Sequence, residues 1–167
     1  MQIKNNEERD AILTAATYAP SGMNSQCWQF TAVQNPAILK ELNENVIRIF
    51  QSIKITNETS LGLEDIKMSG EKDYNFYFNA PALVIASAPK DYENKIADCS
   101  LALENIFLQA TELNIGSCWV SQLTNLCNEH YVRRVLDKIE IPEDHQVIGC
   151  ATLGYSNESE EVEIHRN

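Results

Sequence analysis

The chain has 167 residues, enough for one domain with a full core, and its 44% apolar and 22% charged residues are typical of a globular protein. Its formal net charge of −11 argues against nucleic acid and anionic membranes as partners. No apolar run approaches the roughly 18 residues of a membrane span, and the first ten residues lack a secretory signal's hydrophobic core. We therefore expect a single domain over residues 1–167, located in the cytoplasm.

The first third of the chain is predicted to alternate helix, strand and helix. Residues 5–18 have apolar side chains at helical spacing, and Pro20 ends this helix. A short strand follows over 29–33. Asn35-Pro36 then begins a second helix, because Asn is a preferred N-cap and Pro fits the first helical position.

In the middle of the chain, secondary structure is hard to predict over residues 54–79 and clear over residues 82–88. Residues 54–79 are polar, and we expect a loop over 56–62 followed by a helix that ends near Tyr77. Residues 82–88 are continuously apolar, which predicts a central strand buried on both faces.

The last part of the chain is predicted to hold a long helix over 93–113, a strand over 117–121, a short helix over 128–138 and a final strand over 147–153. Helices that alternate with strands favour a layered α/β or α+β domain with a central sheet. The apolar positions of the long helix repeat at intervals of three and four: Ile96, Cys99, Leu103, Ile106 and Ala110.

The five cysteines form neither a C-x-x-C pair nor a cluster with histidine at metal-ligand spacing, so no metal site is expected. Their odd number indicates reduced thiols. Cys27 lies in a loop, where it could line a pocket. A core or space-filling role is nevertheless the favoured interpretation for all five: Cys27, Cys99, Cys118, Cys127 and Cys150.

The most informative segment is the Pro20 loop (residues 20–26, sequence PSGMNSQ), which joins the first helix to the first strand. Pro20 directs the chain, and Gly22 permits a positive φ or the close approach of a ligand. The loop's uncharged donors and acceptors suit the ribityl hydroxyls and pyrimidine edge of a flavin. They equally suit a turn whose side chains bond their own backbone, and composition alone favours that turn. These polar residues are Ser21, Asn24, Ser25 and Gln26.

The order P-S-x-x-N-x-Q-x-W from Pro20 to Trp28, with an apolar strand directly after it, resembles the signature of the nitroreductase family of FMN-dependent flavoproteins. This resemblance implies the α+β class: a three-layer α/β/α sandwich around a central mixed sheet. It also implies an obligate homodimer with two FMN molecules at the interface, where the loop of one subunit covers the FMN held mainly by the other. The residues implied to contact or support the flavin are Pro20, Ser21, Gly22, Asn24, Gln26 and Trp28.

Two later segments extend the resemblance. Residues 113–122 (LNIGSCWVSQ) look like a family helix-to-strand segment, which implies that Ser121 and Gln122 present backbone N–H groups to the flavin N5 edge. The alternative there is a plain buried strand with Trp119 in the core. Residues 147–155 (VIGCATLGY) match a segment that the family follows with a cation for the FMN phosphate. His165 and Arg166 fall at that distance, although chain ends are often frayed.

The start of the chain departs from the family pattern. Family members carry a segment with paired arginines before the Pro-Ser loop, whereas Lys4 and Arg9 are the cations that precede Pro20 here. This departure puts the phosphate site in question. Two polar residues also stay open: Asp98 is either a buried anchor or a solvent-facing carboxylate, and His145 is most simply a surface residue.

The resemblance implies an FMN-dependent oxidoreductase that passes electrons from NAD(P)H to a nitroaromatic, a quinone or a similar small acceptor by a ping-pong mechanism. No side chain need act as acid or base, so no catalytic residue is named, and the sequence has no nucleophile–base motif, Walker loop or G-x-G-x-x-G. The alternative is a flavin-binding or non-catalytic homodimeric protein with a degenerate cofactor site.

Overall fold

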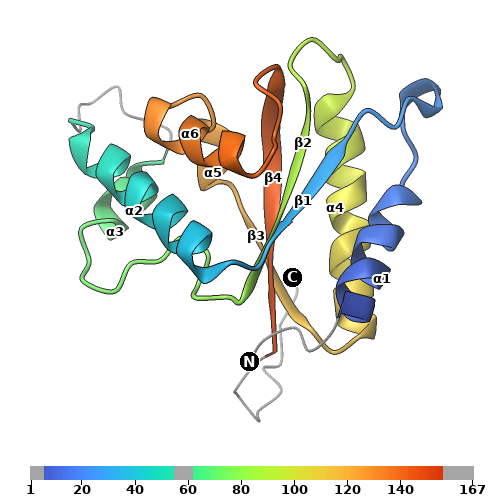
Figure 1. Cartoon of the computed structure of the whole chain (residues 1–167), viewed down its shortest axis with the longest axis horizontal. Helices are drawn as coiled ribbons and strands as arrows, with labels where there is room; N and C mark the ends of the chain where they lie inside the picture. The colour runs from blue at the N-terminus through green and yellow to red at the C-terminus, as the bar shows by residue number, and fades with distance from the viewer. Residues whose placement is uncertain (1–5, 55–61, 156–167) are drawn as a thin grey trace, which may run out of the picture.

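The computed structural model describes residues 6–54 and 62–155. Helices pack on both faces of one central sheet (Figure 1). The elements in chain order are α1 (Asn6–Thr17), a 3-10 turn η1 (Gly22–Asn24), β1 (Gln29–Val33), α2 (Pro36–Ser52), α3 (Leu63–Met68), β2 (Ala82–Pro89), α4 (Lys95–Glu112), β3 (Gly116–Val120), α5 (Gln122–Leu126), α6 (His130–Lys138) and β4 (His145–Gly154).

The four strands lie in the order β1-β2-β4-β3, and each neighbouring pair within the described residues is antiparallel. The α+β class and the nitroreductase-like layering are confirmed, but the expected mixture of parallel and antiparallel pairs is not found here. Strands β2 and β3 do run in the same direction, joined by α4. Because β4 returns between them, each of the two has an antiparallel neighbour instead.

Strand β2 shows why the domain has three layers. Leu83 and Ile85 belong to the core beneath α2, α3, α5 and α6, whereas Ala82, Val84 and Ala86 belong to the core beneath α1 and α4. Successive side chains of a strand point to opposite faces, so a continuous apolar run supplies both cores. The small side chains on the second face allow α4 to pack closely on the sheet, and α1 packs on α4.

Several predicted elements match the structure. The Asn35 side chain accepts a hydrogen bond from the Ala37 N–H at 2.9 Å, and Pro36 is the first residue of α2. Strand β1 has the predicted bounds. Helix α4 buries Cys99, Leu103, Ile106 and Ala110 as expected, but Ile96 of the predicted stripe is 65% exposed. Residue 5, where the first helix was predicted to begin, and most of the predicted loop over 56–62 lie outside the described residues.

The segment before β2 differs from the prediction, because α3 ends at Met68 rather than near Tyr77. Short backbone turns and side chains, rather than a helix, satisfy the backbone of this segment. Asn43 of α2 donates to the Tyr74 carbonyl at 3.3 Å and accepts from the Phe76 N–H at 3.0 Å. Asn75 Oδ1 accepts from two further N–H groups, each at 3.1 Å. Helix α5 was also missed by the sequence patterns.

The core role predicted for Cys118 is wrong, and so is the alternative that placed Trp119 in the core of a plain buried strand. Cys118 is exposed and Trp119 is 41% exposed, since β3 lies at the edge of the sheet. One part of the Trp119 ring nevertheless packs over Gly149 of β4, where an added Cβ would lie 2.5 Å from the indole. Of the other cysteines, Cys99, Cys127 and Cys150 are buried as expected, and Cys27 is half-buried.

Candidate functional site

The Pro20 loop projects from the end of α1 at the upper right of Figure 1 and has an unusual backbone. Met23, Asn24 and Gln26 have φ angles of 56°, 55° and 48°, in the left-handed region that non-glycine residues seldom adopt. The left-handed conformation costs such a residue roughly 1–2 kcal/mol. Three in one short loop therefore need stabilisation from their surroundings.

Some of that stabilisation comes from within the loop. The Gln26 N–H donates to Ser21 Oγ at 3.1 Å, and the Gln26 side-chain amide donates to Asn24 Oδ1 at 2.9 Å. Pro20, Asn24 and Gln26 are nevertheless exposed, while Ser21 and Gly22 are half-buried. The loop is thus a structured turn whose carboxamides still face outward, where a ligand could reach them.

The rest of the stabilisation comes from the residues that begin α4. Asp98 is 5% exposed, and its two carboxylate oxygens accept the Gly22 N–H at 3.1 and 3.2 Å. Tyr92 donates its hydroxyl hydrogen to Asp98 Oδ2 at 2.6 Å and lies 2.6 Å from Ser25 Oγ. The bond to Asp98 is the largest influence on Tyr92 and raises its pKa. Asp98 is therefore a buried anchor.

Sequence patterns did not assign Asp98 and Tyr92 to the loop. The available signal was the position of Asp98 four residues before Ala102, which places a carboxylate on the apolar face of α4. A buried carboxylate requires donors, but the sequence does not tell which ones.

The second part of the predicted site follows the edge strand β3. Ser121 is exposed, and Gln122 begins α5, so its backbone N–H has no acceptor within that helix. The Gln122 amide donates to Asp65 Oδ1 at 2.9 Å. A cavity of about 480 Å³ adjoins Gln122 and is lined also by Asp65, Tyr74 and Phe78.

Two polar atoms at this cavity have unmet hydrogen-bonding capacity. Gln122 Oε1 and the Tyr74 hydroxyl are buried, and neither has a hydrogen-bond partner in good geometry among the described residues. Burial, followed by the charge of Asp65, raises the pKa of Tyr74 to about 12, and Gln122 opposes this shift. The phenol therefore stays protonated at neutral pH and is able to donate.

The two parts of the predicted site do not meet within one chain. The Pro20 loop precedes β1, Ser121 follows β3, and these strands form the two edges of the sheet. Three strand spacings of roughly 4.8 Å separate the edges by about 14 Å. No hydrogen bond joins residues 20–26 to residues 121–122 in the described part of the chain.

The structure does not test His165 and Arg166, the two cations predicted for the FMN phosphate. Lys4, His165 and Arg166 lie outside the described residues. Arg9 is described, and its guanidinium donates to Asp10 at 2.8 and 3.0 Å. Arg9 is therefore already paired with a carboxylate of its own helix.

Other kinds of site find little support in residues 6–54 and 62–155. They contain neither a group of three metal-ligating side chains nor a helix long and apolar enough to cross a membrane. Ser87 Oγ lies 3.2 Å from His145 Nδ1, but Ser87 is fully buried and no substrate could reach it. Burial lowers the pKa of His145, whose side chain is partly exposed at the start of β4.

Comparison with known proteins agrees with this fold. The model of the Nitroreductase family matches residues 5–155. A nitroreductase from Bacteroides fragilis, solved with bound FMN, superposes with a TM-score of 0.88 at 37% identity, covering 100% of this chain and 85% of that one. A nitroreductase from Desulfitobacterium hafniense, also with bound FMN, gives a TM-score of 0.80 over 99% of this chain and 85% of that one; its 21% identity supports the fold alone.

A curated protein of Archaeoglobus fulgidus, whose provisional name pairs NADH dehydrogenase with NAD(P)H nitroreductase, is 28% identical over 159 residues, or 93% of this chain and 76% of that protein. The family model spans nearly all of the described domain, and the 37% identical structure covers the whole chain. The chain belongs to the nitroreductase family.

Proposed function

We propose that this protein is an FMN-dependent oxidoreductase that passes electrons from NAD(P)H to a nitroaromatic, a quinone or a similar small acceptor. The single observation that carries the proposal is the conformation of the Pro20 loop. Its backbone is strained and is anchored to Asp98, and its carboxamide side chains are exposed. Strained backbone of this kind is typical of ligand sites. The family membership and the FMN of the Bacteroides fragilis relative supply the identity of the ligand.

The described residues fit the uncharged parts of FMN. The loop offers Asn24 and Gln26, and the cavity beside β3 offers Gln122 Oε1 and the protonated Tyr74 hydroxyl, both still without partners among the described residues. Ser121 and Gln122 would hold the N5 edge through their backbone N–H groups. The phosphate would be held by His165 and Arg166, which are proposed from the sequence alone.

When bound, FMN would supply the exchange of two electrons between nicotinamide and acceptor. The protein's own part is to bind and orient. An N–H group of Ser121 or Gln122, fixed before reaction, would stabilise charge that develops at the edge it faces. We name no catalytic side chain. Since donor and acceptor would use one place in turn, the kinetics should be ping-pong.

We propose further that the working form is a homodimer with a cofactor at each interface. Two separated half-sites in one chain support this, because a second copy could bring the Pro20 loop of one subunit to residues 121–122 of the other. An exposed apolar surface is also available. The large exposed apolar side chains around α1, the loop and α4 are Tyr18, Met23, Ile96, Leu101 and Leu108.

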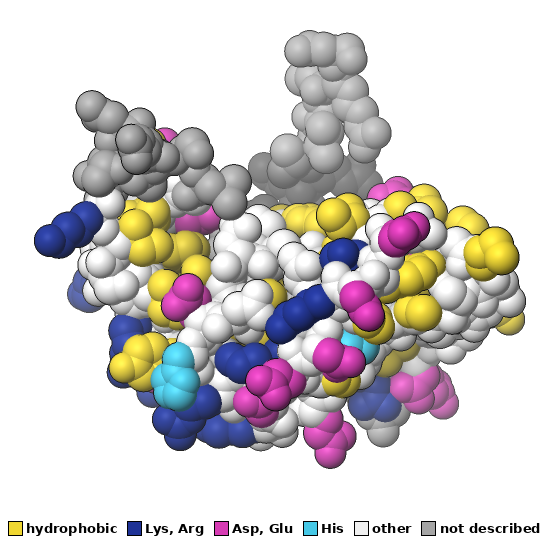
Figure 2. Space-filling model, turned by 90° about the horizontal axis from the view of Figure 1, so that it is seen from above, with side chains coloured by type: hydrophobic (Ala, Val, Ile, Leu, Met, Phe, Trp, Pro, Cys, Tyr) yellow, Lys and Arg dark blue, Asp and Glu magenta, His cyan; other side chains and the backbone are white. Residues whose placement is uncertain are grey.

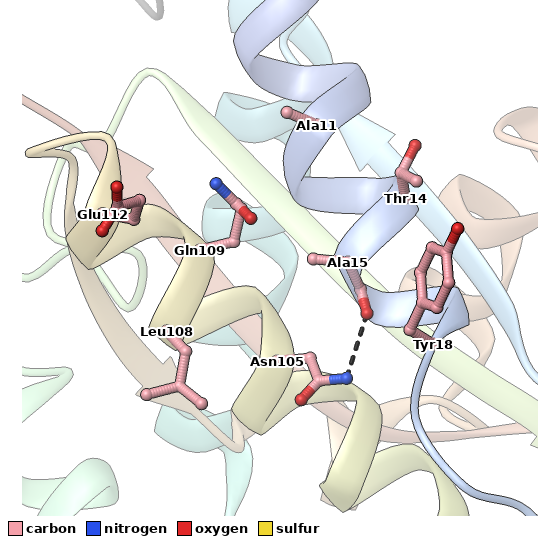
Figure 3. A pocket seen from close by; sticks show the side chains of 8 residues that line it. All are labelled: Ala11, Thr14, Ala15, Tyr18, Asn105, Leu108, Gln109 and Glu112. Atoms are coloured by element: carbon pink, nitrogen blue, oxygen red, sulfur yellow. Dashed lines mark hydrogen bonds between the residues drawn. The ribbon is translucent and has the colours of Figure 1, made fainter.

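A groove of about 630 Å³ runs between α1 and α4 within this surface (Figure 3). Ala11 and Ala15 leave the space open on one side, and Leu108 and Gln109 contribute from the other. Asn105 donates to the Ala15 carbonyl at 3.0 Å and ties the two helices together. Figure 2 shows more Lys and Arg toward the left-hand end, where α2 and α6 lie, and more hydrophobic side chains, interspersed with acidic ones, toward the right-hand end, where α1 and α4 lie. Such a surface favours a second copy of the chain as its partner.

The decisive test is the absorbance spectrum of the purified protein, together with identification of any extracted cofactor. Flavin absorbance, bleaching by NADH or NADPH, and reoxidation by a nitroaromatic or quinone with parallel double-reciprocal plots would support the proposal. A colourless protein that takes up no added FMN would contradict it. A flavin-loaded protein that no nicotinamide bleaches would instead support the non-catalytic alternative.

A further inference from the structure

The inference concerns how the Pro20 loop keeps its conformation, and it rests on the proposed function. We propose that Asp98 is a positioning residue for the cofactor: together with Tyr92 it holds the Pro20 loop in the left-handed backbone that receives the flavin. Asp98 does not touch the cofactor in this proposal. It acts through the backbone of Gly22 and the hydroxyl of Ser25.

The loop needs an external hold because its conformation is costly. Met23, Asn24 and Gln26 all have positive φ. Met23 is fully exposed, so packing of its side chain does not offset the strain. Residues in such conformations persist only where the surrounding structure imposes them. The hydrogen bonds within the loop supply part of this hold, and contacts from outside the loop must supply the rest.

The contacts from Asp98 of α4 and from Tyr92, three residues before α4, lie on either side of Met23 and Asn24. Gly22 directly precedes Met23, and its N–H donates to both oxygens of Asp98. Ser25 directly follows Asn24, and its hydroxyl lies 2.6 Å from that of Tyr92. Tyr92 gives its single hydroxyl hydrogen to Asp98. Ser25 is therefore the donor to Tyr92, and the hydrogen-bond chain from both sides ends on one buried carboxylate.

Steric fit reinforces this anchoring. A Cβ at Gly22 would lie 2.3 Å from Asn94 Nδ2 and 3.0 Å from Tyr92 Oη. The backbone of the loop can approach the start of α4 this closely because residue 22 is glycine. The Asp98 carboxylate can therefore accept the Gly22 N–H, whereas a side chain at position 22 would hold the loop backbone too far from α4 for this bond.

The consequence for binding is preorganisation. A loop that is already ordered loses less conformational freedom when the ligand arrives, and the affinity is correspondingly higher. Removing the charge of Asp98 should therefore lower FMN affinity without changing any group that contacts FMN. It should also loosen the loop in the absence of FMN.

The test uses the full-length protein with the variant Asp98→Asn, which keeps the shape of the side chain. The matched control is Asp91→Asn, which removes the same charge from an exposed position near the start of α4. Three quantities are measured: the Kd for FMN by fluorescence titration, amide hydrogen exchange of the peptide covering residues 20–26 in the cofactor-free protein, and global stability in urea. Because hydrogen bonds to charged groups are strong, we expect Asp98→Asn to raise the Kd about tenfold and to speed loop exchange selectively. Asp91→Asn should change neither.

A second variant separates positioning from general destabilisation. Glycine adopts positive φ without the steric penalty, so adding Met23→Gly to Asp98→Asn should recover several-fold of the lost affinity. If Asp98→Asn fails to fold, Tyr92→Phe takes its place, since it removes the hydroxyl that links Ser25 to Asp98.

Wild-type FMN affinity in Asp98→Asn with unchanged loop exchange would overturn the inference. So would a loss of affinity that merely follows global stability and is not rescued by Met23→Gly. If the wild-type protein binds no FMN, the proposed function fails. The exchange experiment on cofactor-free protein then decides alone whether Asp98 positions the loop: faster exchange supports it, and unchanged exchange overturns it.

Discussion

Tyr155 donates its hydroxyl hydrogen to Glu8 Oε1 at 2.7 Å, which joins two residues 147 positions apart. This hydrogen bond is the main reason that the pKa of Tyr155 is raised. It holds the last described residue against the first helix, beside Arg9. The two ends of the described chain therefore lie together.

We predict that Arg166→Ala weakens the binding of FMN about tenfold and leaves the binding of riboflavin unchanged. Riboflavin lacks the phosphate, so comparing the two ligands isolates the charge-assisted hydrogen bonds that Arg166 would make. Fluorescence titration with each ligand measures the difference. Arg134→Ala, an exposed arginine on α6, is the control. An equal loss of affinity for both ligands would show that Arg166 does not bind the phosphate.

Asn24 is predicted to bind the flavin through its side chain. Asn24→Ala should weaken FMN binding by about 1–3 kcal/mol, the cost of losing a buried hydrogen bond. Asn24→Gly should lose a similar amount, yet it should unfold at higher urea concentration than Asn24→Ala, because φ is 55° at this position. Fluorescence titration and urea unfolding measure these effects. FMN affinity equal to that of the wild type in both variants would contradict the assignment.

The groove between α1 and α4 is predicted to be the dimer surface. Leu108 is 60% exposed there, and Leu108→Glu would bury a charge in an apolar interface, so it should give monomers of 18.9 kDa and abolish FMN retention. Light scattering after size-exclusion chromatography measures the mass. Ile53→Glu, at an exposed position just after α2, should remain dimeric. A wild-type protein that is itself monomeric would refute the homodimer.

Cysteine reactivity should follow exposure. Burial raises the pKa of Cys99 to about 12 and raises that of fully buried Cys150 as well. The thiolate is the reactive form, and at pH 8 a pKa near 12 leaves about one part in ten thousand of the thiol ionised. A brief maleimide pulse, read by peptide mass spectrometry, should therefore label exposed Cys118 first. The buried cysteines should react only after denaturation, and prompt labelling of native Cys99 or Cys150 would argue against this core.

Local features of the fold could be predicted from the sequence. The Asn35-Pro36 pair predicted the start of α2, because an N-cap residue and a first-turn proline act on the backbone only a few residues away. The continuous apolar run of β2 predicted a strand buried on both faces, because successive side chains of any strand point to opposite faces of the sheet. The order of residues from Pro20 to Trp28 indicated the family, and the family model confirms it.

Contacts between distant residues were decided only by the tertiary structure. The insertion of β4 between β2 and β3 left β3 at the edge and exposed Cys118 and Trp119. Asp98 acquired its role because folding brought it to Gly22, 76 positions away. The order of the strands and the hydrogen-bond partner of a buried carboxylate depend on which surfaces the whole chain buries together. Patterns within a few neighbouring residues do not determine this.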